Sequence, residues 1–511
     1  MSLRKTTRFI CTEDYPIVDT PKGKIHGYVD GDVFCFHGIE YAYAKRFHMP
    51  EPAEVWEGVK RAHDYGCGCP EMTYSLEGKK DGNELILPQR LWYMSENVQN
   101  LNVWTKSIEK GAKKPVMVWF HGGGFSGGAA QHLYSYEGWE MAENYDVVLV
   151  SVNHRLNMLG FMDLSEFGEE YRYSGNAGIA DLVEALKWVR DNIACFGGDP
   201  DNVTIYGQSG GGGKVSTLMN TPVADGLYHK AIIQSGVMRD RTNADTHKAM
   251  VRRAVELLGL TKDTIDDIVS MDYNKVADAV RTAMAEKHMS PMSWAPMPDG
   301  EYYLGSPLDY GFREETKDIP LITGTVVTEF VPSPVGDKSR WSFEKKEQTV
   351  RERFGDKTSA VMKAFEEAYP ELDVSYAACV DLAMRPTTLD FLEKKKAASD
   401  TPVFNYVVTY ELPYLGGMML GHNTDLHLMF HNALNVEGMV KEGVTERLQD
   451  EMAGAWAAFA RNGDPDHEKM IHWEAWDPRN KACMAFGDKT MLKINHDSML
   501  RLFAEPPFRI G

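Results

Sequence analysis

The chain has 511 residues, of which 43% are hydrophobic, and its formal net charge is −19. This composition can bury a large core, and an α/β fold with long excursions between strands accommodates the length. The negative charge repels polyanions, so nucleic acid and anionic membranes are excluded as expected partners. No run of residues approaches the ~20 apolar positions of a membrane span.

Strand-like apolar runs alternate with helical patterns such as residues 179–193. The predicted strands are 116–120, 147–152, 203–206, 231–233, 321–323 and 403–409. This alternation predicts a mostly parallel sheet with helices on both faces, in a single α/β domain over residues 1–511. The more charged stretches 239–310 and 338–400 are predicted to be helical excursions that form the wall and lid of a pocket.

The first chemical motif is a glycine-rich loop after the apolar strand 116–120, with the sequence His121-Gly-Gly-Gly-Phe125. Consecutive glycines can aim bare backbone N–H groups at one point. In serine esterases, such a loop supplies half of an oxyanion hole, and Gly123 and Gly124 are the predicted donors. The alternative is a flexible turn, because Gly127 and Gly128 follow closely.

The second motif, Gly207-Gln-Ser-Gly-Gly211, follows a strand-like run and opens a segment that can become a helix. This is the context of a nucleophile elbow, so Ser209 is the predicted nucleophile and Gly210 a further oxyanion donor. The alternative is an ordinary Gly/Ser turn, because the pattern is common by chance.

Four consecutive glycines, at positions 210–213, occupy the expected start of the helix. Each costs on the order of 1 kcal/mol relative to alanine in a helix interior. Close packing against neighbouring backbone, or space beside an acyl group, would account for them. An irregular first turn is the alternative.

These motifs, together with segments along the whole chain, resemble the type-B carboxylesterase family, the carboxylesterase and cholinesterase-like branch of the α/β-hydrolases. The further segments are 38–42, 46–58, 69–70, 101–104, 153–155, 160–161, 175–204 and 456–465. The resemblance implies the α/β-hydrolase fold and ester hydrolysis by a serine mechanism that needs no metal or organic cofactor.

The resemblance also implies the acid of a catalytic triad. Thr328 and Glu329 follow a buried strand-like run that ends in Gly324, at the place where the family has its acidic pair. Glu329 is therefore the predicted acid, with Asp299 and Asp318 as nearby competitors.

For the base, Gly421-His422 precedes an acid and an apolar patch, as in the family, so His422 is predicted. The alternatives are that His427 or His431 is the base, or that these two histidines bind a metal at i and i+4 spacing. A zinc site would need a third ligand motif, so no metal is predicted. The order Ser209, Glu329, His422 is the one expected for this fold.

Three positions depart from the family pattern. Gln208 replaces the usual acid before the nucleophile, which argues against a site for quaternary ammonium substrates. Phe330 and Asn423 replace glycines that usually follow the acid and the histidine, so both enlarge the side chains beside the triad.

Several side chains are candidates for binding the substrate. Gln208, Phe125, Trp294 and Met418 are predicted to line the pocket, although aromatic residues and methionines of this kind are more often core. Ser235 lies in a segment that resembles one behind the nucleophile and is predicted to be structural.

The chain has seven cysteines, an odd number, and they are scattered along it, so they do not form the pattern of a disulfide framework. Secreted relatives commonly bridge the cysteine that matches Cys69, but Val98 stands at the partner position. Residues 1–8 are polar and basic and lack the apolar core of a signal peptide. Together these features predict a reducing cytoplasm.

The sequence therefore predicts a serine carboxylesterase that hydrolyses small neutral esters through an acyl-enzyme. One alternative is an acetyl or feruloyl esterase acting on plant-derived oligosaccharide esters. A non-catalytic binding module of the same fold is the other, against which the retained Ser209, Glu329 and His422 argue. Neither the physiological ester nor the oligomeric state follows from the sequence.

Overall fold

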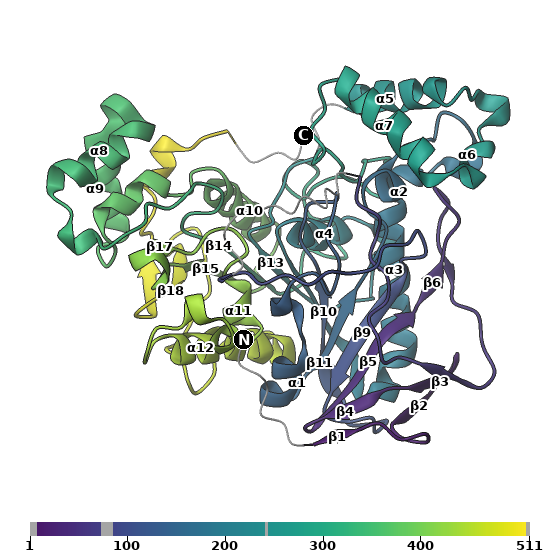
Figure 1. Ribbon diagram of the computed structural model, residues 1–511. Coiled ribbons are helices and arrows are strands. Elements are labelled where there is room, and N and C mark those ends of the chain that lie inside the picture. The colour runs from purple at the N-terminus through teal and green to yellow at the C-terminus, as the bar shows by residue number, and fades with distance from the viewer. Residues whose placement is uncertain (1–7, 73–84, 241–243, 507–511) are drawn as a thin grey trace.

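The computed structural model describes residues 8–72, 85–240 and 244–506 (Figure 1). Its central sheet has twelve strands. In spatial order they are β1 (Phe9–Ile10), β4 (Tyr28–Asp30), β5 (Val33–Glu40), β9 (Asn100–Thr105), β11 (Val148–Val152), β10 (Lys114–Phe120), β12 (Gly198–Gln208), β13 (Lys230–Gln234), β14 (Leu321–Val326), β15 (Val403–Val408), β18 (Ala482–Phe486) and β19 (Met491–Ile494).

The strands from β11 to β18 run parallel, and antiparallel strands complete both edges. All six predicted strands correspond to β10–β15. Small sheets are formed by β2 (Ile17–Thr20), β3 (Gly23–His26) and β8 (Val59–Arg61), by β6 (Ala42–Tyr43) and β7 (Glu51–Pro52), and by β16 (Glu411–Leu412) and β17 (Met418–Met419). The predicted mostly parallel α/β fold is confirmed.

Helices cover both faces of the sheet (Figure 1). They are α1 (Trp139–Tyr145), α2 (Asn157–Phe161), α3 (Ala177–Asn192), α4 (Gly210–Met219), α5 (Ala244–Leu257), α6 (Asp267–Ser270), α7 (Tyr273–Glu286), α8 (Phe343–Phe354), α9 (Thr358–Ala368), α10 (Met384–Ala398), α11 (Leu426–Met429) and α12 (Thr445–Asn462). The predicted helix at 179–193 corresponds to α3 and the short turn after it.

Strand β10 shows why the central strands are apolar throughout. Val116, Val118 and Phe120 belong to the core cluster that also contains the apolar residues of α3 and α4. Met117 and Trp119, between them, belong to a second cluster with residues of α12. Alternate side chains of a strand point to opposite faces, so a sheet covered by helices on both faces needs apolar residues at every position.

The two predicted excursions are helical and lie at opposite sides of the sheet in Figure 1. Helices α5–α7 lie at the upper right, and α8 and α9 lie at the upper left. Residues 241–243 of the first excursion lie outside the described ranges. The role of either excursion as a lid stays a prediction.

Within the described ranges, no helix has the length and apolar character needed to cross a bilayer. The N-terminal segment that lacks a signal-peptide pattern falls, up to residue 7, outside those ranges.

Candidate active site

Ser209 stands on a strained turn between β12 and α4. Its φ and ψ are 57° and −127°, a conformation that L-residues rarely adopt. Hydrogen bonds hold the turn on both sides. Ser209 N–H donates to the Gln234 carbonyl over 2.9 Å, and the Ser209 carbonyl accepts from Gly213 N–H over 2.9 Å. The side chain is partly exposed, at the N-terminus of a helix. This is the geometry of a nucleophile elbow.

The four glycines after Ser209 form a regular helix start and are packed tightly. A Cβ on Gly210 would lie 2.1 Å from the Gly124 carbonyl oxygen, and one on Gly211 would lie 2.0 Å from that of Phe120. A Cβ on Gly212 would lie 2.9 Å from the α-carbon of Gly236. Close backbone packing therefore accounts for the first three glycines of the run, and the irregular-turn alternative is wrong because α4 begins at Gly210.

The glycine-rich loop lies against this elbow. Gly123 and Gly124 have φ values of 90° and 62°, in the left-handed region that favours glycine. Gly123 O accepts from Ser126 N and Gly127 N, at 3.2 and 3.1 Å, which tightens the loop. Among the described residues no acceptor pairs with the N–H groups of Gly123 and Gly124. These groups are available to bind an oxyanion.

His422 and Glu329 are joined by a short hydrogen bond. His422 Nδ1 lies 2.5 Å from Glu329 Oε2, and His422 N donates to the Glu329 carbonyl over 2.8 Å. The other carboxylate oxygen accepts from Ser235 Oγ at 2.7 Å and from Val326 N at 3.0 Å. Glu329 is only 3% exposed, so its carboxylate is fixed in one orientation.

The competing acids and bases are engaged elsewhere. Asp299 accepts from Asn176 and from the backbone of the loop that follows it, and Asp318 accepts from Ser399. His427 pairs with Asn432 and His431 with Asp450. In the described part of the chain, no third ligand joins His427 and His431 in a metal-binding group.

Gln208 contacts the predicted base. Its Nε2 lies 3.2 Å from His422 Nε2. Because Nδ1 of the neutral imidazole donates to Glu329, Nε2 carries the lone pair and accepts from the Gln208 amide. No hydrogen bond joins Ser209 Oγ to His422 among the described residues. Serine–histidine bonds often tighten only when substrate binds.

The two positions that replace family glycines both shape the surroundings of His422. The Phe330 ring lies 4.1 Å from the imidazole, centroid to centroid, and this side chain is 50% exposed. Asn423 has a φ of 67°. Asparagine is one of the few residues other than glycine that adopts this conformation at modest cost, so the backbone after His422 keeps its path.

Two further buried carboxyl groups, which the sequence analysis missed as part of the site, lie near Glu329. Burial raises the pKa of Asp425 to about 7, and the neighbouring Glu329 charge acts in the same direction. Burial and Glu329 likewise raise the pKa of Asp381 to about 6. Neither carboxylate oxygen of Asp425 has a hydrogen-bond partner outside its own residue among the described residues. Asp425 could have been found from the sequence, because it lies three positions after His422. No local pattern points to Asp381.

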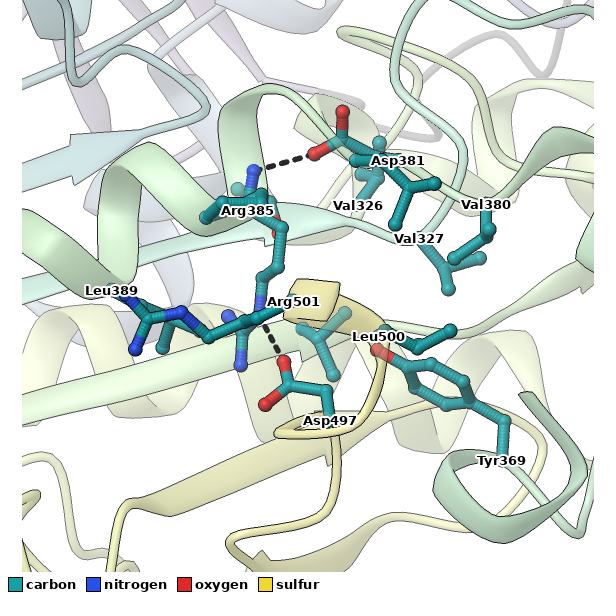
Figure 2. Close-up of a pocket in the computed structure, with 14 residues that line it drawn as sticks. Val326, Val327, Tyr369, Val380, Asp381, Arg385, Leu389, Asp497, Leu500 and Arg501 are labelled. Atoms are coloured by element: carbon teal, nitrogen blue, oxygen red, sulfur yellow. Dashed lines mark hydrogen bonds and ion pairs between the residues drawn. The ribbon is translucent and has the colours of Figure 1, made fainter. Parts of the chain in front are cut away.

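Figure 2 shows a small cavity beside Asp381, which accepts from Arg385 N at 2.6 Å. The Arg385 side chain in turn pairs with Asp497 at 2.7 Å. The cavity measures about 10 Å³, room for about one water molecule rather than for an ester.

A buried cluster of three basic side chains, Lys214, His121 and His154, packs against the oxyanion loop. Lys214 Nζ donates to the His121 carbonyl over 2.8 Å. Burial lowers the pKa of Lys214 to about 7 and holds those of His121 and His154 well below their usual value. All three side chains are therefore neutral for much of the range above pH 7.

The predicted substrate-binding residues differ in their exposure. Gln208 is buried against His422, Phe125 is 3% exposed and packs edge-on to Phe161, and Trp294 is 1% exposed beside His247. Met418 is partly buried in β17. Met292, 47% exposed, lies against the glycine-rich loop, because a Cβ on Gly124 would be 3.0 Å from its terminal methyl.

Comparison with known proteins agrees with this geometry. Residues 14–501 match the model of the carboxylesterase family. The chain belongs to the carboxylesterase family. It is therefore a carboxylic ester hydrolase with the α/β-hydrolase fold, which confirms the resemblance seen in the sequence.

Relatives of this carboxylesterase match it over nearly its whole length. The para-nitrobenzyl esterase of Bacillus subtilis (strain 168) is 30% identical, over 95% of this chain and 98% of that protein. An esterase from the anaerobe Clostridium hathewayi, described as able to hydrolyse aliphatic aromatic polyesters, superposes with a TM-score of 0.89 at 38% identity, over 97% of this chain and 98% of that one. A thermophilic para-nitrobenzyl esterase gives a TM-score of 0.76 at 28% identity, over 96% and 99% of the two chains.

Proposed function

We propose that this carboxylesterase hydrolyses small neutral esters by a serine mechanism, with Ser209 as nucleophile, His422 as base and Glu329 as the acid that orients it. The observation that carries the proposal is the 2.5 Å bond between His422 and Glu329, beside a strained serine at a helix N-terminus. Three segments far apart in sequence converge there. A merely structural serine turn has no need of a buried acid–histidine pair.

The mechanism follows from these contacts. When substrate enters, His422 Nε2 exchanges its hydrogen bond with the Gln208 amide for one with the Ser209 hydroxyl. His422 then takes the hydroxyl proton as Ser209 Oγ attacks the ester carbonyl. N–H groups of Gly123, Gly124 and Gly210 stabilise the oxyanion. His422 then protonates the leaving alcohol, and water repeats the sequence on the acyl-enzyme. Glu329 stabilises the imidazolium in both halves of the reaction.

The surroundings of His422 support neutral substrates. Gln208 brings no charge next to the nucleophile, and the half-exposed Phe330 and Met292 present apolar surface beside His422 and the oxyanion loop. We place Phe125 and Trp294 as the rigid wall behind that surface. Plant oligosaccharide esters remain the alternative substrate class, and the similarity to active esterases over nearly the whole chain argues against the binding-module alternative.

A reducing compartment is part of the proposal. All seven cysteines lie in the described ranges, and none of them forms a disulfide. Five are buried, and burial raises the pKa of the Cys69 thiol to about 12. Buried thiols of this kind are protected from oxidation rather than used in cross-links.

The test is hydrolysis of p-nitrophenyl esters, from acetate to decanoate, by the wild type and by Ser209→Ala and His422→Ala. We expect kcat/KM to fall about 10⁴-fold or more in both variants, because nucleophile and base act as a unit. The matched control is His431→Ala, which removes another partly buried histidine paired with a carboxylate and should change kcat/KM less than about threefold.

Labelling with a fluorophosphonate provides an independent readout, since mass spectrometry of the adduct should place it on Ser209. Full activity in His422→Ala, or an adduct elsewhere, would contradict the assignment. Activity on feruloylated or acetylated oligosaccharides well above that on simple esters would favour the alternative substrate class.

A further inference from the structure

Three potential metal ligands converge at the edge of the molecule, away from the elbow. They are Cys11, His26 and His63, whose ligand atoms all lie within 4.8 Å of one another. Cys11 follows β1, His26 ends β3, and His63 lies two residues after β8. Strand β1 lies at the bottom of Figure 1 and β3 at the lower right, whereas helix α4, which directly follows Ser209, lies near the centre.

The separation of Cys11 and His63 fits a metal ion bound between them. Cys11 Sγ lies 3.7 Å from His63 Nε2. A tetrahedral zinc ion, with Zn–S near 2.3 Å and Zn–N near 2.0 Å, places sulfur and nitrogen about 3.6 Å apart. The ring centroids of His26 and His63 are 4.7 Å apart at an interplanar angle of 72°, so the two rings meet edge to face rather than stacked.

His26 is buried and has a ring nitrogen without a hydrogen-bond partner among the described residues. The residue is only 7% exposed, and the nitrogen is Nε2. A buried polar nitrogen left unpaired is costly, and coordination would satisfy it.

The backbone around the cluster is fixed before any ion binds. Strands β3 and β8 pair in parallel, with His26 opposite Arg61, and Ala62 N donates to the His26 carbonyl over 2.8 Å. Gly27 N donates to the Pro16 carbonyl over 3.1 Å, and Cys11 Sγ lies 3.8 Å from the Gly27 carbonyl oxygen. The two histidines are thus held on the small sheet, and Cys11 approaches them from the main sheet.

We propose that Cys11, His26 and His63 bind one zinc ion, which fastens the N-terminal strand β1 to the small β2–β3–β8 sheet. A mixed thiolate and imidazole donor set favours zinc over magnesium or calcium, which prefer oxygen ligands. Cys11 is exposed, so solvent supplies the fourth ligand. When zinc binds, the S–H bond of Cys11 breaks, its proton passes to solvent, and a zinc–sulfur bond forms. The site takes no part in ester hydrolysis.

The experiment compares zinc binding by the full-length protein and its variants. Reduced, chelator-treated protein is equilibrated with zinc chloride and desalted, and its zinc content is measured. The wild type should retain one zinc per chain, and Cys11→Ser and His63→Gln should bind zinc at least tenfold more weakly. Cobalt(II) in place of zinc should give the wild type, but not Cys11→Ser, a thiolate-to-metal charge-transfer band.

Two matched variants control for zinc at unrelated sites. Cys67→Ser removes another partly exposed cysteine, and His472→Gln removes an exposed histidine paired with Asp466. Both should bind zinc as the wild type does. Ester hydrolysis should be unchanged in all four variants, which shows that they are folded and separates this result from the proposed catalytic role of Ser209.

Equal zinc affinity in the wild type and Cys11→Ser would overturn the proposal, as would a cobalt complex without the thiolate band. An equal loss of zinc in Cys67→Ser would also overturn it, since the ion would then bind elsewhere.

Discussion

The two halves of the proposed active site are built in different ways. The nucleophile half consists of backbone: two glycine-rich turns pack so closely that atoms beyond Cα are excluded, and Ser209 takes a strained conformation. The acid–base half depends on side chains, because Glu329 and His422 are 93 residues apart and their side chains meet through one hydrogen bond. The first half should therefore be sensitive to added atoms, and the second to added charge.

The largest effect is expected from Gly211→Ala in the nucleophile half. Alanine favours helices, yet its Cβ would lie 2.0 Å from the Phe120 carbonyl oxygen, which cannot move without shifting β10. We expect the free energy of unfolding to fall by about 5 kcal/mol or more, together with loss of ester hydrolysis. Urea denaturation and the yield of folded protein measure this.

Gly213→Ala, two residues further along the same helix, is the matched control. Its Cβ would meet only side-chain atoms, those of Met238 and Phe125, at 3.2 Å or more. We expect a change within about 1 kcal/mol, because these side chains can shift slightly. Similar losses in both variants would refute backbone packing as the reason for the glycine run.

The second prediction is that the two halves make the free energy of unfolding depend on pH in opposite directions. In the nucleophile half the group responsible is Lys214, which contacts the oxyanion loop. Burial lowers its pKa to about 7 in the folded protein, from the ordinary value of 10.5. The unfolded state therefore binds more protons between these values, and stability rises with pH from about 7 to 10.5. Lys214→Met should remove up to about 5 kcal/mol of this rise, so the advantage of the variant over the wild type is greatest at pH 7 and below.

Urea denaturation at pH 6, 8 and 10 checks this, with exposed Lys262→Met as the control. A gap between the Lys214 variant and the wild type that is constant with pH would show that Lys214 is charged when buried.

Asp425, in the acid–base half, should give the opposite slope. Its pKa is raised from 3.8 to about 7 in the folded protein, so the folded state binds more protons between these values. Stability conferred by the neutral carboxyl is present below about pH 4 and is lost as pH rises through 7. Asp425→Asn should remove up to about 4 kcal/mol of this loss, and so be more stable than the wild type at pH 8.

Thermal unfolding at pH 5 and 8 measures the difference, and Asp14→Asn, at an exposed position, is the control. Equal shifts in melting temperature at both pH values would mean that Asp425 is ionised throughout, and the contrast between the two halves would then disappear.

The same contrast explains what the sequence could predict. The strands, the elbow and the glycine loop were predictable because apolar periodicity and the need for glycine at a crowded or left-handed position are local properties. Whether Glu329 rather than Asp299 or Asp318 faces His422 is not local. It depends on the carboxyl ends of β14 and β15 lying side by side, which strand order decides.

The sequence by itself determined the α/β architecture, the family and the position of the serine, since these follow from patterns within a few residues. Only the tertiary structure decided that Gln208 contacts His422, that Asp425 lies buried near Glu329, and that Cys11 meets His26 and His63. Such contacts join side chains brought together by packing, and a linear pattern carries no record of which distant residues share a buried environment.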